Sequence, residues 1–324
     1  MSSITDTEVP LTAEGYTYHL HCDAEHLADN IILVGDPGRV DLVAAFLAPV
    51  DYRQTHREIN VVTGYYHQKK ITVISTGMGT DNVEIILNEI HILKEFDAKL
   101  KRWKEKTEAV RIVRLGTCGS PSSTVKVGDL AVTAYAVGLD NTCQYYNRQH
   151  TPSELVQRLT AAVQQKTSLK HIPLYGAAAS VPLRAALIAA METYNHQHKE
   201  NTVGYVEGIT CSASGFYGCQ GRAVGRLAPH LAAPDLVEEL SHVAVEDEQQ
   251  QQVWRVINLE MESSALCFLS SLLGYQACSV CVVLAARHHT HDQSESVFLS
   301  EAEKELKLNA AAEIILRTLS AGES

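Results

Sequence analysis

The sequence predicts an α/β fold, a three-layer α/β/α sandwich around a central mixed β-sheet. Short apolar segments alternate with segments of helical periodicity along the whole chain, and several of the apolar segments end in Gly-containing turns. No Pro/Gly/Ser-rich linker divides the chain. We therefore expect a loose polar N-terminal arm over residues 1–15 and one domain over residues 16–324.

The first half of the chain supplies four strands in the prediction. Two helices are expected, over 40–47 and over 82–96, where Asp81 and Glu84 would form a capping box. Residues 97–109 are rich in Lys and Glu, which is typical of a solvated helix extension or a surface loop. The predicted strands cover residues 30–35, 70–75, 110–115 and 129–136.

The second half adds two further strands and four helices. The polar tract Gln249–Gln252 is interpreted as the surface of a helix. The predicted strands cover residues 203–211 and 277–286. The predicted helices cover residues 154–165, 182–198, 260–273 and 299–319.

Composition excludes several classes of function. The 324-residue chain carries a net charge of −11, which disfavours nucleic acids and anionic membranes as partners. No secretory signal and no apolar segment of membrane-spanning length is evident, so a cytoplasmic protein with eight reduced cysteines is expected. Cys278 and Cys281 lie in a buried strand pattern, and His288, His289 and His291 in a loop, so no metal site is predicted.

Two carboxylates flank a methionine in Glu260-Met261-Glu262, at the predicted start of an apolar helix. A carboxylate that faces a cleft there can accept hydrogen bonds from sugar hydroxyls, and Met261 can pack against an apolar face of the ligand. An ordinary acidic helix start explains the same residues when they are taken alone, because the helix dipole favours acids at that position.

Three predicted strand ends carry glycine beside a polar or basic residue, in segments 35–39, 77–82 and 114–119. Glycine lets backbone N–H groups approach an anion, and ligands of α/β folds collect at the carboxyl ends of strands. Arg39 and Arg114 offer planar forks that match phosphate oxygens, and Thr117 adds a hydroxyl. Plain turns with surface arginines are the alternative for each segment.

A fourth segment, residues 210–222, combines an aromatic ring with two hydrogen-bonding side chains. Phe216 can stack on a flat ring, Gln220 offers an acceptor and two donors, and Arg222 offers donors. Gln220 and Arg222 together match the carbonyl, N–H, carbonyl edge of a pyrimidine-dione. A loop with a core phenylalanine and a surface arginine is the alternative.

These segments together resemble the nucleoside phosphorylase superfamily, and the uridine phosphorylases most. The matching stretches are VGDPGRV, THRE, STGMG, RLGTCG, FYGCQGR and NLEMES, in the family's order. The resemblance implies a pentosyltransferase of pyrimidine salvage that carries out reversible phosphorolysis of uridine to uracil and ribose 1-phosphate, and it leaves deoxyuridine and thymidine open as further substrates. A purine nucleoside phosphorylase, a water-using nucleosidase and a non-catalytic nucleoside-binding relative remain alternatives.

The resemblance also implies roles for residues in this chain, with His19 and Arg57 reaching the site of a neighbouring subunit. The residues expected at phosphate are Gly35, Arg39, Arg57, Arg114 and Thr117. Those expected at ribose are His19, Glu260, Met261 and Glu262. Those expected at the base are Phe216, Gln220, Arg222 and Arg287. The catalytic residues among them would be Arg114, Gln220, Arg222 and Glu262.

Arg287 occupies a position where the resemblance favours pyrimidine over purine nucleosides. Inorganic phosphate is the expected co-substrate, with no other cofactor, and a structural monovalent cation is expected near Glu58. The expected assembly is a homodimer, alone or within a hexamer. The chain departs from the family's Gly-x-Gly-x-Pro-Ser at Thr80-Asp81-Asn82, and Cys219 stands where glycine is usual.

Overall fold

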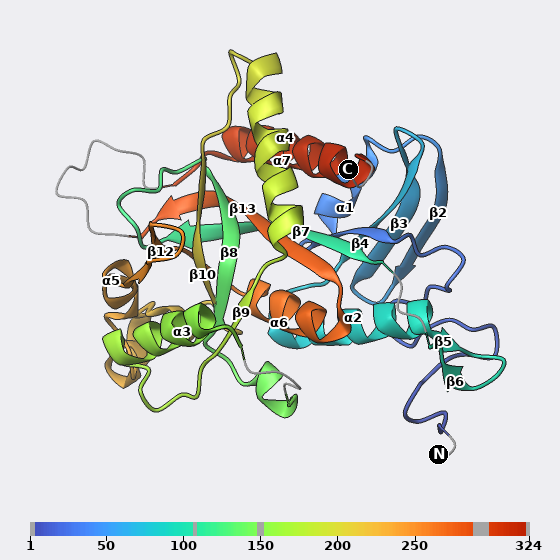
Figure 1. Cartoon of the computed structure of the whole chain (residues 1–324), viewed down its shortest axis with the longest axis horizontal. Coiled ribbons are helices and arrows are strands. Elements are labelled where there is room, and N and C mark those ends of the chain that lie inside the picture. Colours follow the sequence, from blue (N-terminus) through green and yellow to red (C-terminus); the bar gives the residue numbers. More distant parts are fainter. Residues whose placement is uncertain (1–3, 106–108, 148–151, 288–297, 322–324) are drawn as a thin grey trace.

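A mixed 11-stranded sheet runs through the part of the molecule that the computed structural model describes, residues 4–105, 109–147, 152–287 and 298–321 (Figure 1). A separate two-stranded hairpin, β5 (Phe96–Asp97) and β6 (Arg102–Trp103), lies within the segment expected to be a solvated extension or loop. The strands of the large sheet are β1 (Asn30–Val34), β2 (Val50–His56), β3 (Ile59–Tyr66), β4 (Lys69–Ser75), β7 (Arg111–Ser120), β8 (Leu130–Gly138), β9 (Tyr175–Ala178), β10 (Tyr205–Ser212), β11 (Ala244–Asp247), β12 (Gln252–Glu260) and β13 (Gln276–Ala286).

Helices cover both faces of the sheet, which confirms the predicted three-layer α/β architecture (Figure 1). One layer holds α1 (Gly38–Ala44), α4 (Val181–Gln197) and α7 (Glu301–Ser320). The other holds α2 (Thr80–Glu95), α3 (Glu154–Lys166) and α6 (Ser263–Leu273), with α5 (Leu236–Ser241) nearby. Short 3₁₀ turns are η1 (Thr142–Tyr145), η2 (Gly218–Gln220) and η3 (Gly225–His230). None of the described helices is both long and apolar enough to cross a membrane.

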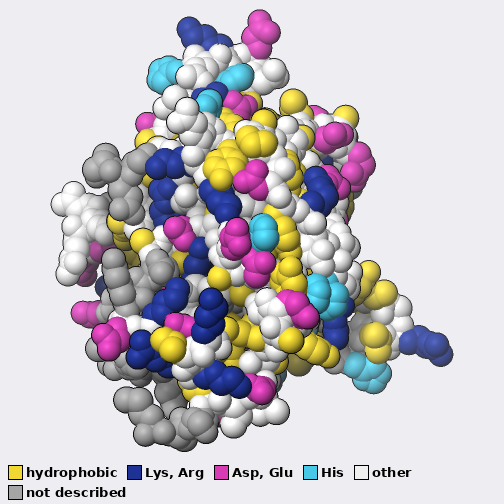
Figure 2. All heavy atoms as spheres, turned by 90° about the vertical axis from the view of Figure 1, so that its right-hand side faces the viewer, with side chains coloured by type: hydrophobic (Ala, Val, Ile, Leu, Met, Phe, Trp, Pro, Cys, Tyr) yellow, Lys and Arg dark blue, Asp and Glu magenta, His cyan; other side chains and the backbone are white. Residues whose placement is uncertain are grey.

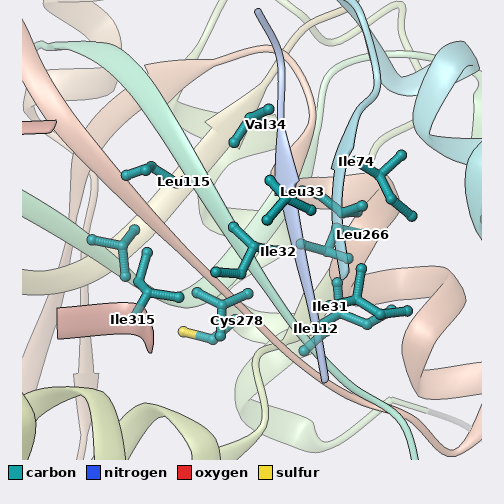
Figure 3. Close-up of a cluster of buried hydrophobic side chains, with 14 of the residues drawn as sticks. Ile31, Ile32, Leu33, Val34, Ile74, Ile112, Leu115, Leu266, Cys278 and Ile315 are labelled. Atoms are coloured by element: carbon teal, nitrogen blue, oxygen red, sulfur yellow. The ribbon is translucent and has the colours of Figure 1, made fainter. Parts of the chain in front are cut away.

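Strand β1 lies at the centre of the core, and Ile31, Ile32, Leu33 and Val34 are fully buried. Figure 3 shows them among side chains of β4, β7, β13, α6 and α7. A parallel strand covered on both faces has a continuous apolar sequence, which is why this strand could be predicted without any alternation.

The topology brings several strand ends together. The strands β4, β1, β7 and β13 are parallel neighbours, so their carboxyl ends meet at one edge of the sheet. Strand β12 runs parallel to β10 and also pairs with β7 where Leu259 lies opposite Gly119. This second pairing curls the sheet and places the end of β12 beside the end of β7.

Three local predictions were wrong in detail. Glu260 does not open a helix but ends strand β12, and α6 begins at Ser263 with Glu262 as its N-cap. The tract Gln249–Gln252 leads through a turn into β12, because β12 pairs with β11 in a hairpin. No capping box forms at Asp81, since α2 starts two residues earlier than predicted, at Thr80, with Gly79 as N-cap.

The N-terminal residues of the described chain lie beside the β5–β6 hairpin. Asp6 pairs with Lys101 at 2.7 Å between carboxylate and ammonium, and Leu11 forms a bridge with Thr17. Residues 4–15 thus make contacts of their own. The division of the chain at residue 15 stays a prediction.

Candidate active site

Arg114 on β7 is a buried cation held between two carboxylates. Its Nη1 lies 3.1 Å from Glu260 Oε2, and its Nη2 donates to Glu262 Oε2. Burial alone would lower the pKa of Arg114, but the charges of Glu262 and Glu260 raise it well above its usual value. Gly116 gives the guanidinium its space, since a Cβ at that position would lie 1.9 Å from Nη1. Removing Arg114 would leave both buried carboxylates without their counter-charge.

The two carboxylates are oriented by backbone donors. Glu260 accepts hydrogen bonds from the N–H groups of Glu262 and Ser263, both at 3.0 Å, and from the hydroxyl of Ser212. Glu262 accepts one from the N–H of Gly79 at 2.7 Å. Burial raises the pKa of Glu262, while the charge of Arg114 opposes that rise. Glu260 therefore belongs to the frame of the site, and Met261, between the two acids, stays half-buried.

Arg39 brings a second guanidinium to the same place. Its Nη1 donates to the carbonyl of Leu115 at 3.0 Å. Burial lowers the pKa of Arg39, and the nearby charge of Arg114 lowers it further. An anion between the two guanidiniums would relieve their repulsion. The half-buried Thr117 lies three residues beyond Arg114 on the same strand.

Glycines shape the loops beside this pair of arginines. A Cβ on Gly35 would lie 3.5 Å from the carbonyl oxygen of Gly77, so the loops after β1 and β4 are neighbours. Gly77 and Gly79 have φ angles of 74° and 98°, which side chains rarely adopt. The N–H of Gly79 is thereby turned to Glu262, and the helix start is formed despite the Thr80-Asp81-Asn82 departure.

Phe216, Gln220 and Arg222 lie together, as the sequence predicts. The guanidinium carbon of Arg222 lies 3.7 Å from the centre of the Phe216 ring, and its Nη1 donates to Gln220 Oε1 at 2.6 Å. Gln220 is buried, and its oxygen orientation is set by Arg222, so its amide N–H₂ remains to donate. The N–H of Ala213, where this loop begins, donates to the carbonyl of Glu260 at 3.0 Å.

Arg287 follows β13 and lies close to Arg222. Its backbone N–H donates to the carbonyl of Ser120 at 2.7 Å, and a Cβ on Gly119 would lie 2.9 Å from its Cδ. Burial lowers the pKa of Arg287 to about 10, and the charge of Arg222 contributes to the shift. These two arginines therefore offer a second region of positive charge beside Gln220.

His19 and Arg57 form their contacts outside the cluster of Arg114, Glu260 and Glu262. His19 Nδ1 is 2.7 Å from the carboxylate of Glu89 on α2, and Arg57, at the β2–β3 turn, donates to the hydroxyl of Tyr18 at 3.2 Å. Glu89 follows Gly79 by ten residues, which is about 15 Å along a helix axis. Figure 2 views the molecule from the β2 side, where hydrophobic and histidine side chains lie among charged ones.

A buried polar network that the sequence did not indicate supports Glu260. Asp140 accepts hydrogen bonds from the hydroxyl of Tyr175 at 2.8 Å and from the N–H of Thr142 at 2.9 Å. The same tyrosine hydroxyl lies 3.0 Å from Ser264 Oγ, and the Ser264 N–H donates at 2.9 Å to Ser212, the residue that donates to Glu260. The order of these residues along the chain gave no signal, because their contacts depend on how separate strand ends meet.

The absence of a metal site stays a prediction. All eight cysteines are free, and seven of them are buried. The described residues contain no group of three or more His, Cys, Asp or Glu side chains arranged to hold an ion. His288, His289 and His291 lie outside the described residues.

Comparison with known proteins identifies the family of this chain. The family model described as "Phosphorylase superfamily" matches residues 29–320. The chain is 28% identical to a uridine phosphorylase of Thermococcus kodakarensis over 288 residues, which covers 89% of this chain and 83% of the relative. A DeoD-type purine nucleoside phosphorylase of Bacillus subtilis is 32% identical, but over 36% of this chain and 46% of its own length.

Solved structures extend the likeness to the whole fold. A nucleoside phosphorylase of Trypanosoma brucei, described as showing uridine phosphorylase activity, superimposes with a TM-score of 0.89 at 40% identity, covering 96% of this chain and 99% of the other. A uridine phosphorylase of Phytophthora capsici superimposes with a TM-score of 0.71 at 19% identity, covering 97% of each chain, and supports the fold alone. The present chain therefore belongs to the phosphorylase superfamily.

Proposed function

We propose that this protein is a uridine phosphorylase, a pentosyltransferase that converts uridine and phosphate reversibly to uracil and ribose 1-phosphate. The observation that carries the proposal is the convergence of two sites at one edge of the sheet. The paired guanidiniums of Arg39 and Arg114 suit phosphate, and the Gln220–Arg222 pair suits the uracil edge. The nucleoside phosphorylase with 40% identity, described as having this activity, supports the same reading.

Phosphate would bind between Arg39 and Arg114, with the loop glycine Gly35 and the hydroxyl of Thr117 beside it. Cleavage of the C–N bond passes through a sugar with oxocarbenium character, as in glycoside hydrolysis. The phosphate charge below C1′ stabilises the developing cation, so no covalent enzyme intermediate is needed. The two arginines thus align the nucleophile and hold the charge that the transition state requires.

Ribose would bind at Glu262, whose carboxylate can accept hydrogen bonds from the sugar hydroxyls, with Met261 against the sugar face. Glu262 lies against Arg114, so sugar and phosphate share one charged pair. Glu260 would act through this pair, because its own carboxylate is held by backbone donors.

Uracil would stack on Phe216 and bind Gln220 through its imide edge. Negative charge accumulates on the base as it leaves, and Arg222 with the neighbouring Arg287 lies where that charge would be stabilised. The positive charge of Arg222 and Arg287 beside Gln220 favours a leaving pyrimidine-dione. A purine that needs a proton donor at N7 finds no acid among Phe216, Gln220, Arg222 and Arg287.

The remaining roles require a second copy of the chain. We propose a homodimer, alone or within a hexamer, in which His19 and Arg57 of one copy reach the ribose and phosphate of the other. Glu58 at the same turn is exposed and supplies one carboxylate, so a monovalent cation there would need oxygen ligands from both copies. We place this enzyme in the cytoplasm, in keeping with the buried free thiols.

Release of free base from uridine, deoxyuridine, thymidine and inosine, each with and without phosphate, tests the proposal. We expect uracil from uridine in the presence of phosphate and little base from inosine. Release from uridine without phosphate would identify a nucleosidase, and faster turnover of inosine a purine phosphorylase. Calorimetric binding of uridine without turnover would indicate a non-catalytic relative.

A further inference from the structure

Arg114 has a third neighbour besides the two carboxylates. Cys281 on β13 is fully buried, and its sulfur accepts a hydrogen bond from Arg114 Nη1 at 3.2 Å. The two residues are 167 positions apart in the sequence, and the β7–β13 ladder brings them together by placing Cys281 opposite Gly116. The sulfur thus lies directly against the side chain on which the proposed phosphate site depends.

The lack of a side chain at Gly116 shows how closely Arg114 and Cys281 pack against the strand. A Cβ there would lie 2.7 Å from both the guanidinium carbon of Arg114 and the sulfur of Cys281. The guanidinium and the thiol therefore share the space above the glycine. A Cβ at this position would displace the guanidinium or the thiol, so glycine is needed for the two groups to lie side by side.

The three nitrogens of the Arg114 guanidinium differ in their hydrogen-bond partners. Nη2 donates to Glu262, and Nη1 lies near both Glu260 and Cys281. Nε is buried without a hydrogen-bond partner among the described residues. Because the guanidinium is planar and rigid, fixing Nη1 and Nη2 also fixes the direction in which Nε points.

The surroundings of Cys281 make its sulfur a good acceptor. The hydrogen bond with Cys118 lowers the pKa of the Cys281 thiol, and the charge of Arg114 lowers it further against the opposing effect of burial. The hydroxyl of Ser279 lies 3.7 Å from the sulfur. The interactions with Cys118 and Arg114 favour a sulfur that accepts a hydrogen bond from Nη1.

We propose that Cys281 is a positioning residue for phosphate: its sulfur fixes the rotation of the Arg114 guanidinium, so that the arginine presents its remaining N–H groups to the anion. This inference rests on the proposed function, in which Arg114 and Arg39 hold phosphate. Cys281 touches neither substrate and acts through the arginine. Loss of the Cys281 sulfur should therefore weaken the binding of phosphate more than the binding of the nucleoside.

The test compares Cys281→Ala with Cys278→Ala in phosphorolysis of uridine. Cys278 lies on the same strand, is equally buried and packs among the core side chains of Figure 3. It is three residues away, so it faces the other side of the sheet from Cys281. We expect Cys281→Ala to raise the KM for phosphate about tenfold, the effect of one lost hydrogen bond to a charged group, with a change of about twofold or less in the KM for uridine. Cys278→Ala should leave both KM values near those of the wild type.

Cys281→Ser supplies the rescue, because a hydroxyl can still accept from Nη1. Its KM for phosphate should lie within about threefold of the wild-type value. Should Cys281→Ala not fold, Cys281→Val fills the space without an acceptor and takes its place in the comparison. Equal phosphate KM values for the Cys281 and Cys278 variants would overturn the inference, as would a joint rise of both KM values or a Ser variant no better than Ala.

The wild-type assay separates failure of this inference from failure of the proposed function. If the wild type releases no uracil, the proposed function is wrong, and calorimetric titration with inorganic phosphate replaces the kinetic readout. Weaker phosphate binding by Cys281→Ala than by Cys278→Ala would still support the positioning role. Equal binding by the two variants would refute it.

Discussion

Two regions of the molecule differ in how their charged groups are held. We call the buried cluster of Arg114, Glu260 and Glu262 the niche, and the surface that carries His19 and Arg57 the edge. In the niche, charged groups from β7, β12 and the α6 start are buried and bonded to one another. At the edge, His19 and Arg57 keep part of their surface exposed and are held by one carboxylate and one tyrosine.

This difference indicates which contacts with the substrates a single subunit can provide. Buried charges interact strongly because little water screens them, so the niche holds a guanidinium between two carboxylates without help from a partner. Arg57 and His19 instead contact Tyr18 and Glu89, and in the proposed assembly they act on a neighbouring copy. A test of the comparison therefore asks which substitutions are harmful within one subunit and which can be repaired by another.

The largest effect is expected for Arg114→Ala. The value of kcat/KM should fall about 10³-fold or more, because phosphate loses a buried charged donor in the transition state. The free energy of unfolding should also fall by about 3–5 kcal/mol, since Glu260 and Glu262 lose their counter-charge. Steady-state kinetics and urea denaturation measure the two effects. Activity within tenfold of the wild type would show that the niche is not the phosphate site.

Arg222→Ala should have the next largest effect. It removes the donor that stacks on Phe216 and orients Gln220, so kcat/KM for uridine should fall about 10²- to 10³-fold while the KM for phosphate stays near its wild-type value. Arg226→Ala, an exposed arginine four residues further on, is the matched control and should leave turnover unchanged. Full activity of Arg222→Ala would show that uracil does not bind at this loop.

The fold was largely predictable because short, nearly continuous apolar segments mark its central strands. In β1, four buried apolar residues follow Asn30 and precede a polar turn, which favours a strand buried on both faces. Strand β12 was missed because its buried end is followed within three residues by the apolar helix α6. Two elements that are apolar in succession give no periodic signal at their boundary.

The site was predictable as a set of residue types and not as a set of contacts. The motifs indicated Arg114 and Glu262, but not that Cys281 lies against the arginine from 167 residues away. Gly116 did carry a signal, since a glycine inside a buried strand marks a close approach by another group. Asp140 carried none, because its partner Tyr175, on β9, meets it only in the folded chain.

Arg57→Ala tests the exposed edge and should cost less, about tenfold to a hundredfold in kcat/KM, because Arg57 supplies one of several phosphate donors. Mixing this variant with Arg114→Ala sharpens the comparison. If Arg57 acts on a neighbouring copy, half of the reassembled dimers are mixed and one of their two sites is intact, so activity should recover to about a quarter of wild type. Lack of recovery after verified subunit exchange would place both arginines in one subunit.

Asp140→Asn should have the smallest effect on turnover, a change of a few fold, because Asp140 reaches Glu260 through other side chains. The variant should lose about 1–3 kcal/mol of stability from the weakened hydrogen bonds of Tyr175 and Thr142. Burial raises the pKa of Asp140 above its usual 3.8, so the folded protein binds that proton more tightly than the unfolded chain does. Stability from the protonated form is complete below 3.8 and is lost as the pH rises through the folded pKa. The deficit of the variant should therefore be largest in acid and shrink as the pH rises, which denaturation curves across that range would show. A deficit that grows with pH would mean that the charged carboxylate stabilises the niche.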